Sequence, residues 1–265
     1  MTNEALPPDL IDQKEENREA LMTWAEHLTE LRSRILKVFV FFSVVFFVLY
    51  PFSGKILDLL MLPLAQAMEK AGGSHRMIFT GVAEGFVTHL KLSAFGAAII
   101  SFPFLTFQVW KFVSPGLYQN ERRFVRPVFI ASPVLFAAGA LFVFFALMPV
   151  ALRFLLSFQQ LTAGENALPV VLEARLGEYL SFLMTLIPAF GISFQLPVVM
   201  VILGRLGLVT AQNLKDFRRY AVVFIFVAAA VLTPPDIISQ LALAFPLLFL
   251  YESALWCIQS LLKPI

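Results

Sequence analysis

The chain has 265 residues, of which 59% are hydrophobic and 14% charged, and its mean hydropathy is +0.80. Apolar runs this long and numerous cannot be buried in one aqueous core, so the composition excludes a soluble globular protein and indicates a multi-span membrane protein. The formal net charge of +2 is small, and the positions of the charges carry more information than their sum.

The N-terminal segment is polar and acidic, so we predict a cytoplasmic tail over residues 1–19 and no cleavable signal peptide. Residues 20–34 follow with apolar side chains at three- and four-residue steps, a pattern typical of an amphipathic helix. Within it, Glu30 and Arg34 have the i,i+4 spacing of an ion pair on one helix face. We expect residues 20–265 to form a single membrane domain.

Six apolar segments predict six transmembrane helices and an all-α fold, at about 35–51, 86–112, 126–150, 178–203, 219–233 and 237–256. The last two look short, because about 13 to 16 apolar residues span only ~20–24 Å of a ~30 Å bilayer core. Residues 53–84 are too polar to cross, and we expect Pro63 to divide two short surface helices at 53–62 and 64–71.

The basic residues are divided unequally between the two sides of the predicted bundle. Of the 20 Lys and Arg residues, 14 lie on the side of the two termini and 6 on the other side. Cytoplasmic loops carry the excess of Lys and Arg, so we expect both termini in the cytoplasm.

A hydrophilic island at residues 111–123 separates the second and third spans. Ser114-Pro115-Gly116 breaks the arriving helix, and Glu121 then lies among Arg122, Arg123 and Arg126. Two interpretations stay open here. The island is a solvated turn whose acid neutralises its neighbours, or a fixed anionic spot at the membrane surface that receives a cationic partner.

The sequence offers little catalytic chemistry. The three histidines lie in separate segments, Cys257 is the only cysteine, and there is no glycine-rich phosphate loop. We therefore expect no enzyme activity, no cofactor and no metal. Gln195 is a lone polar residue in the fourth span, where the simplest interpretation is a hydrogen bond between helices.

Several motifs in order resemble the TatC family, the multi-span receptor of the twin-arginine protein translocase. They are His27–Arg34, Gln108–Phe112 through Pro115 with Leu117-Tyr118, Glu121-Arg122-Arg123, and Leu232–Asp236 with Ser239-Gln240. The resemblance covers about residues 20 to 260 and implies a cup-shaped six-helix bundle in the bacterial cytoplasmic membrane. It implies binding of twin-arginine signal peptides and export of folded proteins by the proton motive force. The implied partners are single-span TatA and TatB proteins, further copies of the chain and membrane lipid, without nucleic acid.

The resemblance also implies roles for individual residues. Glu30 and Glu121 match the two acids of the twin-arginine site, and carboxylates suit this ligand because guanidiniums form paired, planar bonds with them. Phe112 matches the aromatic residue beside the site, and Pro63 matches a proline of the far-side loop. The surrounding cations are expected to orient the two acids and to repel generic basic segments; they are Arg32, Arg34, Arg122 and Arg123.

Four further positions carry expectations of their own. Gln195 stands where many relatives have a cavity-facing glutamate, so a protonation role there is doubtful. Thr233 and Gln240 resemble polar positions where partner helices dock, while Asp236 also suits a helix cap. Two alternatives to the receptor stay open: a proton-coupled small-solute transporter, suggested by Gln195 and the proline-bent spans, and a passive scaffold that gathers single-span partners.

Overall fold

The computed structural model describes residues 24–71, 77–78, 81–159, 175–232 and 237–261, and helices make up nearly all of them. Five segments are long and apolar enough to cross a membrane: Glu26–Lys70, Glu84–Gly116, Arg122–Leu156, Leu176–Arg205 and Gln240–Ser260. A sixth helix, α9 (Ala211–Leu232), begins with charged residues and is apolar from Tyr220 onward. The predicted fold class, a polytopic all-α membrane protein, is confirmed. The predicted tail, residues 1–19, lies outside the described part of the chain.

The first helix, α2 (Trp24–Leu49), joins the predicted amphipathic segment and the first span into one rod. After a 3₁₀ turn it leads into α3 (Ser53–Ala71), which continues through Pro63. The prediction of two short helices is therefore wrong. Pro63 is buried and lacks an N–H group, and the Tyr179 hydroxyl donates to the Leu60 carbonyl at 2.8 Å, in the turn just before the proline. The carbonyl that the proline leaves without its helical donor is that of Leu59, so the Tyr179 bond does not replace the lost one but ties the next residue of α3 to α7. Membrane proteins tolerate proline inside helices, and α3 continues through it.

The hydrophilic island is mostly helical. Helix α4 (Glu84–Val113) ends in a 3₁₀ turn at Ser114–Gly116, which confirms the predicted break. Helix α5 (Gln119–Phe142) then begins well before the predicted residue 126, because its first turns are polar yet helical. A π-helical turn at Val143–Leu147 carries it on into α6 (Met148–Leu156).

The fourth span is divided into α7 (Leu176–Ser193) and α8 (Leu196–Arg205), with Phe194 and Gln195 in the break. Here α5 and α7 lie very close together: a Cβ atom added to Gly139 on α5 would lie only 2.8 Å from the Phe190 carbonyl oxygen on α7. Only glycine fits this contact between two helices.

The last two helices are longer than predicted. Helix α9 begins inside the expected loop 204–217, and α10 (Ile237–Leu261) runs past residue 256, so the expected shortness is wrong for α10. Two contacts hold the added first turns of α9 against α10. Arg218 Nη2 lies 2.7 Å from Glu252 Oε2, and the Tyr251 hydroxyl donates to the Leu214 carbonyl at 2.7 Å.

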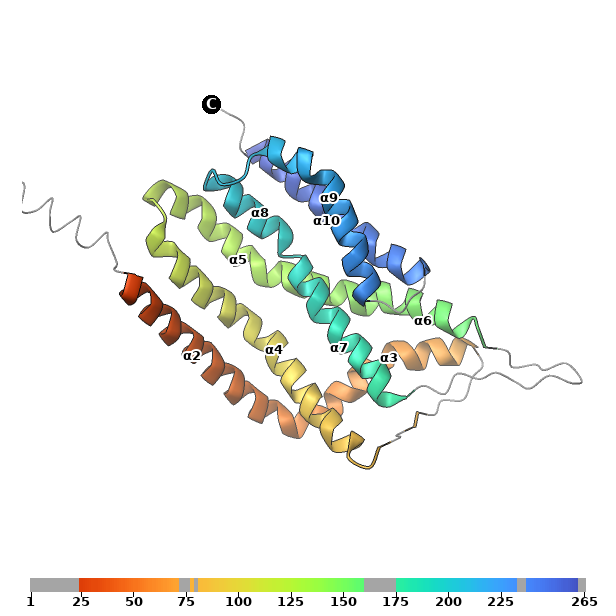
Figure 1. Ribbon diagram of the computed structural model, residues 1–265. Coiled ribbons are helices and arrows are strands. Elements are labelled where there is room, and N and C mark those ends of the chain that lie inside the picture. Colours follow the sequence, from red (N-terminus) through yellow and green to blue (C-terminus); the bar gives the residue numbers. More distant parts are fainter. Residues whose placement is uncertain (1–23, 72–76, 79–80, 160–174, 233–236, 262–265) are drawn as a thin grey trace, which may run out of the picture.

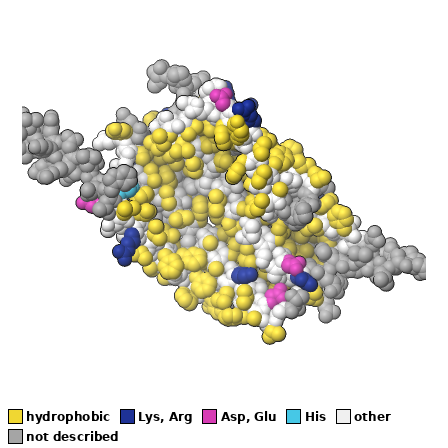
Figure 2. All heavy atoms as spheres, viewed as in Figure 1, with side chains coloured by type: hydrophobic (Ala, Val, Ile, Leu, Met, Phe, Trp, Pro, Cys, Tyr) yellow, Lys and Arg dark blue, Asp and Glu magenta, His cyan; other side chains and the backbone are white. Residues whose placement is uncertain are grey.

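The helices form a layered bundle (Figure 1). Helices α2 and α4 lie side by side at one edge, α5, α7 and α8 occupy the middle, and α9 with α10 form the other edge. The face in Figure 2 is largely hydrophobic with few charged side chains, as expected of a surface that contacts lipid.

We call the end where α2 begins, α4 ends and α5 begins the rim end, and the opposite end the far end.

Candidate functional site

A carboxylate at the rim end is held by an arginine of its own helix. Arg34 Nε donates to Glu30 Oε1 at 3.0 Å, and Arg34 Nη2 contacts the same oxygen, which forms the ion pair expected from the i,i+4 spacing. The Glu30 side chain is only 20% exposed. Its second oxygen, Oε2, is shielded from solvent and has no hydrogen-bond partner among the described residues. Glu30 therefore keeps one unused acceptor.

The same arginine fastens α2 to α4. Arg34 Nη1 donates to Gln108 Oε1 at 3.3 Å, and Nη2 donates to the Lys111 carbonyl at 3.1 Å. Two turns earlier on α2, the His27 ring stacks on Phe112 with centroids 4.2 Å apart. These contacts join the beginning of α2, which carries Glu30, to the end of α4. We call the contacts of Arg34 and His27 with α4 the Glu30 support; Phe112 is part of it.

A groove runs from this support toward the interior between α2 and α4. It has a volume of 420 Å³ and begins at Arg34, Gln108 and Phe112. Deeper in, its lining is apolar except for Ser101, which is 4% exposed and whose hydroxyl has no hydrogen-bond partner among the described residues. We call this cavity the α2/α4 groove. Its mouth contains Arg34, the ion-pair partner of Glu30, and its interior is an apolar slot.

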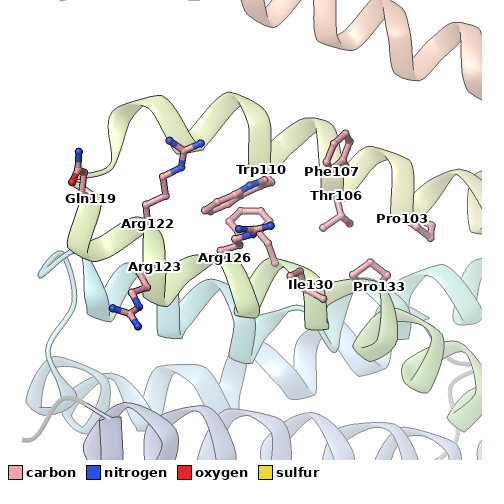
Figure 3. A pocket seen from close by; sticks show the side chains of 11 residues that line it. Pro103, Thr106, Phe107, Trp110, Gln119, Arg122, Arg123, Arg126, Ile130 and Pro133 are labelled. Atoms are coloured by element: carbon pink, nitrogen blue, oxygen red, sulfur yellow. The ribbon is translucent and has the colours of Figure 1, made fainter. Parts of the chain in front are cut away.

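The second predicted acid, Glu121, lies in the first turn of α5, so it is at the rim end on a neighbouring helix; its side chain is outside the described residues. Arg122 and Arg123 are exposed and line a second, larger groove between α4 and α5 (Figure 3). Arg32 is exposed on α2, and Pro115 is exposed in the turn after α4. The residues predicted to bind the signal peptide thus lie on α2, α4 and α5 at one end of the bundle, whereas Pro63, Gln195 and Gln240 lie on other elements.

The polar residue of the fourth span is engaged with a neighbouring helix. Ser132 Oγ donates to Gln195 Oε1 at 2.5 Å, and Gln195 Nε2 donates to the Ser132 carbonyl at 2.9 Å. This two-way bond joins α5 to the break between α7 and α8. Gln240 Nε2 similarly donates to the Phe226 carbonyl at 3.1 Å, which connects α10 to α9. Thr233 and Asp236 lie outside the described residues.

Sequence reasoning missed Glu84 at the far end. Glu84 Oε1 accepts from the Gly177 amide at 3.0 Å and Oε2 accepts from the Gly81 amide at 3.1 Å. A bridge between Ile78 and Arg175 lies beside it. The only signal was an acid in the first turn of a helix, which is too common a feature to predict a contact 93 residues away.

Together these features define a polytopic helical membrane protein whose rim end carries a carboxylate held by Arg34, a residue at the mouth of the α2/α4 groove. The family model for "Sec-independent protein translocase protein (TatC)" matches residues 26–246. The TatC protein of Rickettsia prowazekii is 44% identical over 236 residues, covering 89% of this chain and 92% of that protein. The TatC protein of Escherichia coli K12 is 38% identical over 226 residues, with coverage of 85% and 84%.

A solved structure agrees with these relatives. A crystal structure described as the twin-arginine translocase receptor TatC matches with a TM-score of 0.76 and 32% identity, covering 90% of this chain and 100% of that one. The chain belongs to the TatC family of Sec-independent protein translocase proteins, as the sequence motifs predicted. It is a multi-pass membrane component of the Tat translocase, and its role is protein transport.

Proposed function

We propose that this chain binds twin-arginine signal peptides at the rim end and, with TatA- and TatB-type single-span partners, exports folded proteins across the bacterial cytoplasmic membrane. In this proposal the rim end faces the cytoplasm and the proton motive force drives export. The observation that carries the proposal is the unused Oε2 atom of Glu30.

The chemistry of that oxygen favours a cationic ligand. Arg34 already donates to Oε1, so the carboxylate is oriented before any ligand arrives. Oε2 is shielded from water without a donor, which is unfavourable for an anionic oxygen. A ligand guanidinium reaches it when the partly exposed side chain turns outward, and supplies charge-assisted hydrogen bonds of the strong class.

A second acid is needed to recognise a second arginine. Its location supports Glu121 in this role, because it lies in the first turn of α5, at the same end of the bundle as Glu30 on α2. The neighbouring Arg122 and Arg123 repel basic segments, so a peptide that engages only one acid is not retained. This combination favours two consecutive arginines over scattered positive charge.

The α2/α4 groove suits the apolar segment that follows the arginines of a signal peptide. Its mouth contains Arg34, the partner of Glu30, and its walls are aliphatic and aromatic. A peptide held at the rim therefore has an apolar slot directly beyond its charged part. Ser101 supplies one polar contact within this slot.

The outer edge of the bundle suits single-span partners. Helix α9 exposes a row of apolar side chains that no described helix covers, namely Val223, Phe224, Val227 and Val231.

The solute-transporter alternative has less support, because the bonds between Gln195 and Ser132 account for that polar residue as a helix-to-helix contact.

The test is photocrosslinking of a twin-arginine signal peptide to membranes carrying Glu30→Gln or Glu121→Gln. Glu252→Gln is the matched control, since Glu252 is also paired with an arginine, Arg218, but lies on α10. We expect both rim variants to lose crosslinking and the control to keep it. Full crosslinking in both rim variants would remove the two acids from recognition and leave the scaffold alternative.

A further inference from the structure

A second groove lies between α4 and α5, and it is polar at one end and apolar along the rest. Its volume is 1040 Å³. Gln119 and the arginines lie at the rim end, while Pro103, Phe107 and Pro133 lie deeper between the two helices (Figure 3). Trp110 and Phe129 also line it, with ring centroids 5.1 Å apart. We call it the α4/α5 groove.

Among the described residues, the charged side chains that line it are all positive. They are Arg122, Arg123 and Arg126. All three arginines are exposed, and none makes an ion pair with another described residue. Elsewhere in the described chain Arg34, Arg175 and Arg218 each pair with a glutamate. The α4/α5 groove thus gathers cations whose countercharge the described residues do not supply.

The floor of the groove belongs to segments that cross the membrane. Phe107 lies within Glu84–Gly116, while Ile130 and Pro133 lie within Arg122–Leu156. An occupant must therefore place an anion at the bilayer surface and hydrocarbon below it. Basic pockets between membrane helices are typical sites for anionic lipid headgroups, and tryptophan is enriched at the headgroup level.

We propose that the α4/α5 groove binds an anionic phospholipid, with its phosphate at Arg122 and Arg126 and its acyl chains along Phe107, Ile130 and Pro133. A free phosphate would satisfy the arginines and leave the apolar floor uncovered. A twin-arginine peptide would bring like charges together at the mouth. This site is separate from the Glu30 support on the other side of α4, and it stands whether or not the proposed receptor function is correct.

The first experiment counts lipids bound to the purified full chain. The protein is placed in nanodiscs of phosphatidylglycerol and phosphatidylcholine in equal amounts, and the retained lipids are measured by native mass spectrometry. The groove variant is Arg122→Gln with Arg126→Gln. The control is Lys215→Gln with Arg219→Gln, which removes two exposed cations from the start of α9.

We expect phosphatidylglycerol retention to fall about fivefold for each groove arginine removed, since an arginine that contacts an anionic headgroup strengthens its binding by about this factor. The control pair should retain the wild-type amount. Equal losses in both pairs would indicate nonspecific charge attraction and overturn the proposal, as would full retention in the groove variant. Thermal unfolding of each variant confirms that folded protein is compared.

The second experiment separates a lipid from other ligands. Ile130→Trp fills the apolar floor without changing charge and is expected to lower phosphatidylglycerol retention, whereas soluble glycerophosphate should not displace the lipid. Displacement by glycerophosphate would identify a free-anion site instead. A photoreactive residue at position 130 should yield phospholipid adducts in native membranes. If it formed adducts only with signal peptide and none with phospholipid, the proposal would be contradicted.

Discussion

Two glutamates at opposite ends of the bundle use their carboxylates differently. At the far end, both oxygens of Glu84 accept from backbone amides, those of Gly81 and Gly177, and tie the start of α4 to the start of α7. At the rim end, Glu30 has one oxygen bonded to Arg34 and another with no partner among the described residues. A carboxylate satisfied within the chain stabilises the fold, whereas one with an unused acceptor can bind a ligand. This difference supports the proposal that ligand binding takes place at the rim end.

Removing the far-end carboxylate tests the structural half of this comparison and should have the largest effect on stability. Glu84→Ala leaves the Gly81 and Gly177 amides without their acceptor, and we expect the free energy of unfolding to fall by about 2–3 kcal/mol. Thermal unfolding in detergent measures it. Signal-peptide affinity of the folded fraction should stay unchanged, and unaltered stability would show that this contact is dispensable.

The rim-end carboxylate should give the opposite result. Glu30→Ala removes charge-assisted bonds to the ligand, so we expect signal-peptide affinity to fall about 10- to 100-fold. Stability should change by only about 0.5 kcal/mol, because only an i,i+4 helix pair is lost. Fluorescence anisotropy of a labelled peptide gives the affinity. A large loss of stability with unchanged affinity would reverse the roles assigned to Glu30 and Glu84.

The contacts by which Arg34 holds α2 against α4 can be weakened without removing the Glu30 carboxylate. Arg34→Lys keeps the charge but cannot form the forked contacts with Gln108 and the Lys111 carbonyl. We expect a loss of about 1 kcal/mol in stability and a several-fold weaker peptide affinity. Arg32→Lys is the control, since Arg32 is exposed on the same helix. If Arg34→Lys has no larger effect than Arg32→Lys, the positive charge of Arg34 is sufficient and its forked contacts are not needed.

The smallest effect on peptide affinity is expected for the bond between Ser132 and Gln195, away from both glutamates. Ser132→Ala and Gln195→Leu should each lower stability by about 0.6–2 kcal/mol, the range for polar contacts between membrane helices. Because they break the same contact, the double variant should lose less than the sum. Additive losses would show that the two side chains act independently. Peptide affinity should be unchanged throughout.

The sequence predicted the features that depend on local chemistry. The break at Ser114–Gly116 was predictable because proline and glycine act within a turn, and the pair of Glu30 and Arg34 because both lie on one helix face. Helix ends were less predictable. Hydropathy locates where a chain crosses a bilayer, so it missed the polar first turns of α5 and α9.

The missed parts of the site are contacts between distant residues. Gln108 lies 74 residues from Arg34, and no periodicity links them. Pro63 misled the prediction because proline commonly ends a helix, whereas α3 continues through it and is tied to α7 by the bond between Tyr179 and the Leu60 carbonyl. The unused oxygen of Glu30 could be recognised only once its surroundings were visible.

The most direct test of the central claim is a double-mutant cycle between Glu30 and the arginines of the signal peptide. Affinity is measured for wild type and Glu30→Gln, each with the twin-arginine peptide and with a peptide in which one arginine is replaced by glutamine. If Glu30 grips that arginine, each single change weakens binding at least tenfold, and for one of the two arginine positions the double change weakens it little further. If the losses multiply at both positions, Glu30 does not contact the peptide arginines, and the account of the rim end is wrong.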